Sequence, residues 1–327
     1  MPPVLEVDDL HMHFFTRDGV VKAVDGVTFS LEAGKTLGVV GESGSGKSVT
    51  ALSIMRLVPE PPGKVVSGDI RFKGESILAM EEKDQRALRG NRIAMIFQDP
   101  MTSLNPVYRI GKQIAEPLRV HKNLSKDDAW AAAVELLAQV GIPQPAERAR
   151  HYPHEFSGGM RQRAMIAMAL ACGPDILIAD EPTTALDVTL QLQILKLIQK
   201  LKVQFSMGVL FISHDLGVVK EIADRTSVIY AGKIVESASR RQLFENPLHP
   251  YTKLLLLSIP DAAKRGIRLR AIPGTVPDAE NIPPGCSFHP RCPLAEEGCR
   301  RAIPPTIEYE DGHQAACFLI GKKWIDS

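Results

Sequence analysis

The residues with the clearest chemical potential are "GESGSGKS" at positions 41–48, which match the pattern G-x-x-x-x-G-K-[ST]. Glycines in such a loop allow backbone N–H groups to turn inward around phosphates. Lys47 supplies a positive charge to the β- and γ-phosphates, and the Ser48 hydroxyl can ligate Mg²⁺. The loop follows the apolar run "LGVV", so the pattern predicts a nucleotide phosphate site at the end of a strand.

A second group of polar residues could supply the metal ligands and the base for hydrolysis. "ILIADEP" ends an apolar run with Asp180 and Glu181. We expect Asp180 to hold Mg²⁺ through its water shell and Glu181 to act as general base on the attacking water. Gln98 could reach the metal or that water, and His214 could hydrogen-bond the γ-phosphate. Taken alone, the carboxylates could also be an exposed acidic turn and His214 a structural residue.

Four short apolar runs must position these side chains. Near-continuous apolar runs of this length are typical of strands buried on both faces of a parallel sheet with helical crossovers. In open α/β sheets ligands bind beyond the carboxyl ends of the strands, so we expect the residues that follow the runs to reach one crevice. The runs lie at 37–40, 93–97, 176–179 and 209–213.

Other segments complete the expected α/β architecture. The spacing predicts helices over 127–141, closed by Gly141, and over 189–205. Residues 226–238 read as two strands that turn at Ala231 and Gly232. Prolines become frequent from about residue 258, so we expect a first domain over 1–257 and a small second one over 258–327.

Bulk composition excludes some classes of protein. The 327 residues carry a formal net charge of +1 and are 44% hydrophobic, so there is no basic excess that would indicate nucleic-acid binding. The N-terminus lacks a secretory signal. The longest apolar stretch, 165–179, is interrupted and is shorter than the roughly 20 residues that a membrane span needs. We expect a cytoplasmic location.

"FSGGMRQR" at 156–163 resembles the signature of the ATP-binding-cassette ATPases, usually L-S-G-G-Q. The family's other marks follow in order: the phosphate loop, "FQDP", "ADEP", "ALD" and "SHD". This resemblance covers residues 5 to about 240. It implies an α/β P-loop ATP-binding-cassette fold with a parallel sheet core, an antiparallel β subdomain and a helical subdomain over about 100–160.

The resemblance also implies how ATP is held. Two cassettes would form a head-to-tail dimer, with each ATP between the phosphate loop of one chain and Ser157, Gly158 and Gly159 of the other. Phe156 and Met160 depart from the usual signature but leave the serine hydroxyl and the glycine amides. Phe14, with Phe15 as the competing choice, would stack on adenine. The implied ATP-binding residues are Phe14, Gly41, Ser43, Gly44, Ser45, Gly46, Lys47, Ser48, Val49, Ser157, Gly158, Gly159 and Asp187, and Mg²⁺ would be held by Ser48, Gln98 and Asp180.

Further stretches, including "IFQDPMTSLNP" and "NPLHPYTKLLLLSIP", resemble the ATPase subunits of bacterial dipeptide and oligopeptide importers. That subgroup implies two membrane permease subunits, a second ATPase of similar sequence, an external substrate-binding protein and a peripheral place on the cytoplasmic face of the inner membrane. Residues 99–116 would receive the permeases' coupling helices. Import of another solute such as nickel stays open, as does a cassette ATPase of DNA repair or translation, although the chain lacks their long coiled coils and tandem cassettes.

Four cysteines near the C-terminus, Cys286, Cys292, Cys299 and Cys317, are spaced C-x5-C-x6-C-x17-C. Four thiolates can hold zinc or an iron–sulfur cluster. Structural zinc sites usually contain close C-x2-4-C pairs, which are absent from this set. Members of the resembled subgroup with this pattern bind a [4Fe–4S] cluster, so we expect a cluster, with Zn²⁺ or metal-free thiols as alternatives. A structural role is the favoured one, because a proline-rich domain of this size has little apolar core, and redox sensing is the alternative.

Overall fold

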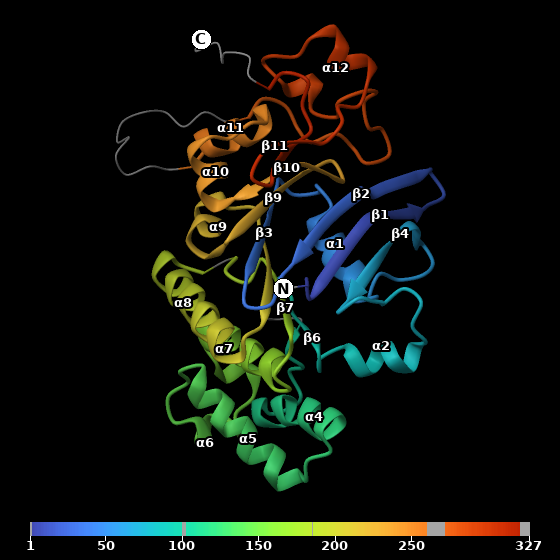
Figure 1. The fold of residues 1–327 in the computed structure, drawn as a ribbon. Helices are drawn as coiled ribbons and strands as arrows, with labels where there is room; N and C mark the ends of the chain where they lie inside the picture. The colour runs from blue at the N-terminus through green and yellow to red at the C-terminus, as the bar shows by residue number, and fades with distance from the viewer. Residues whose placement is uncertain (1, 100–102, 185, 260–271, 321–327) are drawn as a thin grey trace. The chain divides into compact units, whose positions relative to one another are not determined.

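The computed structural model describes residues 2–99, 103–184, 186–259 and 272–320 (Figure 1). The chain forms two compact units, each built from separate stretches of sequence. The first unit comprises residues 1–5, 31–35 and 73–212, and the second comprises 6–30, 36–72 and 213–327. Ala185, at the start of the "ALD" mark, and residues 260–271 lie outside the described residues.

The first unit contains a parallel sheet formed by three of the expected strand regions. β7 (Ile176–Asp180) lies between β6 (Ile93–Ile96) and β8 (Gly208–Ser213), with Ile93 opposite Ile176 and Ile176 opposite Gly208. Every residue of these strands is buried. This confirms that the continuous apolar runs are strands covered on both faces.

Helices make up most of the rest of this unit. α5 (Lys126–Gln139) and α8 (Val188–Phe205) match the two helices expected from the sequence. α5 ends at Gln139, and Gly141 follows with φ 78°, a left-handed conformation that glycine adopts without steric cost. The elements of this unit are β5 (Glu75–Ser76), α2 (Glu82–Leu88), α4 (Ile110–Lys122), α5 (Lys126–Gln139), α6 (Pro145–Arg148), η1 (Pro153–Glu155), α7 (Gly158–Leu170) and α8 (Val188–Phe205).

The second unit contains two groups of strands. One has the order β2–β1–β4, from β2 (Val20–Leu31), β1 (Leu5–Phe15) and β4 (Gly63–Phe72). In the other, β3 (Thr36–Val40) is parallel to β9 (Arg225–Tyr230), which is antiparallel to β10 (Lys233–Ser239). The two strands expected over 226–238 are confirmed, and they turn at Ala231 (φ 46°) and Gly232 (φ 78°).

The C-terminal segment, residues 272–320, adds two strands to the sheet that contains β3, β9 and β10. β12 (His313–Ala315) pairs antiparallel with β10, and β11 (Ile307–Glu310) pairs with β12. Residues 272–320 therefore belong to the same compact unit as β3 and β9. The helices of this unit are α1 (Lys47–Ile54), α9 (Leu216–Ile222), α10 (Arg240–Glu245), α11 (Pro250–Leu257), η3 (His289–Arg291) and α12 (Glu297–Arg301).

A buried carboxylate anchors the C-terminal segment to β10. Glu236, fully buried, accepts hydrogen bonds from the backbone N–H groups of Leu248 and His249, both at 2.8 Å. Its Oε1 also lies 2.8 Å from Nε2 of His313 on β12. Because a buried carboxylate is costly unless it is hydrogen-bonded, these contacts fix both the entry to α11 and the position of β12.

No helix among the residues described is long and apolar enough to cross a membrane.

Candidate functional site

The phosphate loop follows β3 in the second unit and leads into α1. A Cβ atom at Gly41 would overlap the carbonyl oxygen of Ile229, and one at Gly46 (φ 101°) would overlap that of Ala23. Glycine is therefore required at both positions by close backbone approach. α1 begins at Lys47 without a side-chain cap, and the N-terminus of a helix attracts anions.

Lys47 is held inside the loop. Its side chain is 5% exposed, and its Nζ donates to the carbonyl oxygens of Gly41 and Glu42, both at 2.8 Å. The hydroxyl of Ser45 is buried and has no hydrogen-bond partner among the described residues. A buried hydroxyl without a partner is costly, which fits a loop built to receive the oxygens of a ligand.

Two residues from later in the chain, Tyr251 and Arg291, form hydrogen bonds with Glu42 in the first turn of this loop. The guanidinium of Arg291 donates two hydrogen bonds to the carboxylate of Glu42, each 3.0 Å long. The hydroxyl of Tyr251, on α11, accepts the backbone N–H of Glu42 at 3.0 Å. Burial, the largest cause, raises the pKa of Tyr251, so that hydroxyl stays protonated. Tyr230 and Phe288 pack on the Tyr251 ring, at centroid distances of 4.7 and 5.2 Å.

The candidate hydrolytic residues lie in the first unit. Asp180 is the last residue of β7 and is buried. Glu181 follows with φ 46°, a left-handed conformation that is costly for a residue other than glycine. This turn redirects the chain directly after the strand. The backbone N–H of Glu181 donates to the carbonyl oxygen of Ile212, which fixes the turn against β8.

Two side chains orient the Glu181 carboxylate. Nε2 of Gln98 lies 3.3 Å from Oε2, and the Thr184 hydroxyl donates to the same oxygen at 2.9 Å. Gln98 follows β6, which pairs with β7, so strand adjacency explains this meeting. Sequence reasoning missed Thr184, although its position three residues after Glu181 in a tight turn is a usable signal.

The signature residues form the start of α7. Ser157 is the N-cap residue, and its hydroxyl accepts the backbone N–H of Met160 at 3.4 Å. A Cβ atom at Gly158 would meet no atom within 4 Å, so this turn is open on one side. Phe156 is only 3% exposed, so the residue that departs from the usual leucine fills a core position. Met160 contributes its backbone amide, which a glutamine would also supply.

The remaining expected residues take varied positions. Asp187 caps α8 by accepting the N–H of Leu190 at 2.9 Å. His214 is exposed and directly follows β8. Phe14 is half-buried at the end of β1, in the second unit, and Phe15 is 49% exposed. Ser43 and Gly44 are exposed in the phosphate loop, while Ser48 and Val49 lie in the first turn of α1.

The four cysteines all lie in the second unit. Cys286 and Cys299 are joined by a 2.8 Å backbone hydrogen bond. Burial, the largest cause, raises the pKa of the Cys292 and Cys317 thiols to about 11, and the negative charges of the other cysteines add to the rise. This mutual effect shows that the four thiols converge. No disulfide links them in the structure described.

The four sulfur atoms do not form a close group. Among the residues described, no three of them lie within 4.8 Å of one another.

Comparisons with known proteins identify two regions. Residues 24–184 match the family model described as "ABC transporter", and residues 235–299 match the one described as "Oligopeptide/dipeptide transporter, C-terminal region". The second region contains Tyr251, Arg291 and three of the four cysteines.

Relatives match over nearly the whole chain. A probable peptide ABC transporter ATP-binding protein, y4tR of Sinorhizobium fredii, is 54% identical, covering 96% of this chain and 94% of its own. The oligopeptide transport ATP-binding protein AppD of Bacillus subtilis is 50% identical, covering 98% and 97%. The dimeric structure of the ATP-binding cassette MJ0796 bound to ADP and Pi matches 72% of this chain and 99% of its own, with 25% identity and a TM-score of 0.65.

Proposed function

This chain belongs to the ABC transporter ATPases, and we propose that it hydrolyses MgATP to power the import of dipeptides or oligopeptides through a membrane permease. The single observation that carries the cargo class is the match of residues 235–299 to the C-terminal region of oligopeptide/dipeptide transporters. Relatives named as peptide, oligopeptide and dipeptide transport ATP-binding proteins are at least 50% identical over nearly the full length.

In this proposal the second unit binds the nucleotide's phosphates. The amides of residues 43–49 surround the phosphate oxygens, because α1 starts without a side-chain cap and its N-terminus attracts anions. Lys47 leaves its two carbonyl partners for the β- and γ-phosphates. Phe14 stacks on adenine, which is supported by its half-buried place at the end of β1.

Glu181 acts as the general base in hydrolysis. Gln98 and Thr184 both contact Oε2 and so orient the carboxylate, which accepts a proton from the attacking water. Asp180, Gln98 and Ser48 are oxygen donors of the kind that Mg²⁺ prefers, and the ion supplies charge neutralisation when bound. His214 donates a hydrogen bond to the γ-phosphate.

Ser157, Gly158 and Gly159 act on the ATP held by a second cassette. The open side of Gly158 and the helix N-terminus capped by Ser157 suit a phosphate presented from another chain. The dimeric cassette MJ0796 was solved with ADP and Pi bound. We propose a different but homologous ATPase as the partner, in an assembly with two permease subunits and an external binding protein, on the cytoplasmic face of the inner membrane.

The permease contact involves the segment that leads into α4. Val107 is 70% exposed and Tyr108 is 43% exposed, and Nζ of Lys112 lies 4.0 Å from the centre of the Tyr108 ring. Exposed apolar and aromatic side chains beside a cation are typical of protein interfaces. Residues 100–102 of this segment lie outside the described residues.

The four cysteines hold a [4Fe–4S] cluster in a structural role. Their place in one compact unit and the effect of their charges on one another's pKa values support a group that the four thiols share. The cluster would be held by Cys286, Cys292, Cys299 and Cys317, and it would link the end of the chain to the segment that carries Arg291. An absorption spectrum of anaerobically purified protein, with iron and zinc analysis, separates a coloured cluster from colourless zinc.

Uptake of labelled peptides by membrane vesicles tests the cargo. Vesicles that contain the permease, the binding protein and both ATPases should accumulate peptide when ATP is supplied, and Glu181→Gln in this chain should reduce that uptake strongly. Uptake of nickel in place of peptides would contradict the proposed cargo while leaving the ATPase assignment intact.

A further inference from the structure

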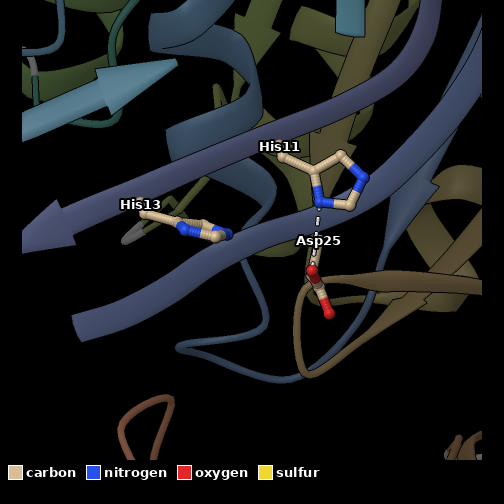
Figure 2. Close-up of side chains that lie close together, drawn as sticks. All are labelled: His11, His13 and Asp25. Atoms are coloured by element: carbon tan, nitrogen blue, oxygen red, sulfur yellow. Dashed lines mark hydrogen bonds and ion pairs between the residues drawn. The ribbon is translucent and has the colours of Figure 1, made fainter. Parts of the chain in front are cut away.

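Two histidines and an aspartate meet on neighbouring strands of the second unit, and none has a role in the proposed hydrolysis (Figure 2). They are His11 and His13 on β1 and Asp25 on β2. One ligand atom from each lies within 4.8 Å of those of the other two, and no other group of three or more histidine, cysteine or acidic side chains does so in the part of the chain described.

The strand geometry brings the two imidazoles together. Residues i and i+2 of a strand lie on one face, so His11 and His13 share a face while Met12 between them is buried in the core. Figure 2 shows the ring of His13 directed toward the Asp25 carboxylate and a contact between His11 and Asp25.

His11 lies between two carboxylates. Its Nε2 is 3.2 Å from Oδ1 of Asp9, and its Nδ1 is 3.1 Å from Oδ1 of Asp25. Metal-binding histidines usually donate the N–H of their second ring nitrogen to a carboxylate, which fixes the tautomer. If Nε2 donates to Asp9, the lone pair of Nδ1 faces a carboxylate oxygen 3.1 Å away, and a metal ion between these two acceptors would satisfy both.

His13 provides an independent indication of a ligand. Its Nε2 is buried and has no hydrogen-bond partner among the described residues. A buried imidazole nitrogen without a partner is costly unless it binds something.

We propose that His11, His13 and Asp25 form a binding site for a divalent transition-metal ion such as Zn²⁺ or Ni²⁺. Nδ1 of His11, Nε2 of His13 and Oδ1 of Asp25 are the ligands, and Asp9 orients His11. Imidazole nitrogens suit Zn²⁺, Ni²⁺ and Cu²⁺, whereas Mg²⁺ prefers oxygen ligands, so the Mg²⁺ that accompanies ATP does not compete.

Lys233 limits the affinity of this site. Its Nζ lies 2.7 Å from Oδ2 of Asp25 and also donates to the Asp25 carbonyl oxygen. The ammonium group partly neutralises the carboxylate and repels a second cation. Oδ1 still faces His11, so the site binds metal but more weakly than an isolated two-histidine, one-aspartate set.

Backbone hydrogen bonds connect this site to the phosphate loop. The N–H of Asp25 donates to the carbonyl oxygen of Gly232 at 2.9 Å, and the N–H of Gly232 donates to that of Ser45 at 3.0 Å. Asp25 therefore supports the loop as well, so replacing it would alter two features at once. His13, whose Nε2 has no described partner, is the cleaner residue to replace.

Calorimetric titration of the full-length protein with Ni²⁺ tests the proposal. Wild-type protein should show a Ni²⁺-binding event that His13→Gln removes and that Asp9→Asn weakens by about 10- to 100-fold. The control variant His154→Gln, which changes a histidine of the first unit, should leave it unchanged. Because the four cysteines are intact in all variants, any binding by them cancels in the comparison.

Lys233→Met tests the same site by an increase in Ni²⁺ affinity, because it removes a competing charge and no ligand. It should tighten Ni²⁺ binding by about tenfold, because the competing positive charge is gone. Equal Ni²⁺ binding by wild-type protein and the His13→Gln variant, with no tightening in Lys233→Met, would overturn the proposal.

Discussion

Arg291 in the C-terminal segment holds Glu42 in the phosphate loop through two hydrogen bonds of 3.0 Å, across 249 positions of sequence. Arg291 is 5% exposed, and its Nε also donates to the carbonyl oxygen of Pro273. A bidentate pair fixes the orientation of both groups. The geometry of the nucleotide-binding loop therefore depends on residues near the end of the chain.

Replacing Arg291 tests this dependence. Arg291→Met should weaken ATP binding about tenfold, which corresponds to about 1.4 kcal/mol, because the loop loses a fixed contact and Glu42 loses its charged partner. Arg300→Met, at an exposed position of α12, is the matched control. A double-mutant cycle with Glu42→Gln should show coupling between the two positions. Additive effects would show that the pair does not position the loop.

His249 should make folding sensitive to acid. Burial, the largest cause, lowers the pKa of His249 from 6.5 to about 4. Below pH 6.5 the unfolded chain binds a proton that the folded chain refuses until about pH 4, so stability falls as the pH drops through this window. The loss is on the order of 3 kcal/mol.

The matched variant is His249→Asn, since asparagine can still accept the N–H of Tyr251 that Nδ1 of His249 accepts at 3.0 Å. Urea unfolding at pH 7 and pH 5 should show a smaller acid-induced loss for this variant than for wild-type protein. An equal loss in both proteins would assign the acid sensitivity to other groups.

Removing a cysteine of the proposed cluster site should affect the nucleotide site indirectly. Cys299→Ser should abolish the visible absorption of anaerobically purified protein and lower its thermal stability by several degrees. It should also weaken ATP binding, because η3, which carries Arg291, lies between Cys286 and Cys299. Cys172→Ser, at a buried position on the C-terminal side of α7, is the control and should keep the absorption. A colourless wild-type protein with bound zinc would contradict the cluster.

Much of the sheet could be predicted because a strand that is buried on both faces is apolar at nearly every position. The runs that became β3, β6, β7 and β8 are continuously apolar, and each leads into a polar residue or glycine at the expected place. Adjacent strands then explain why Gln98 and Glu181 meet.

Contacts between distant segments could not be predicted in the same way. No sequence pattern around Arg291 or Glu42 indicates that the two residues pair. Whether they meet depends on the path of the chain after α11. The left-handed conformation of Glu181 was also not apparent from its type, because a non-glycine residue adopts it only where the surrounding structure enforces it.

Replacing Glu181 with glutamine is the sharpest test of whether the chain hydrolyses ATP with Glu181 as general base. Glutamine can keep the contact with Thr184 but cannot accept the proton, so ATP binding should be unchanged while turnover falls by about 100-fold or more. Glu135→Gln, on the exposed face of α5, is the control. ATP binding and phosphate release should be measured on the assembled transporter. Normal phosphate release by Glu181→Gln would contradict the account.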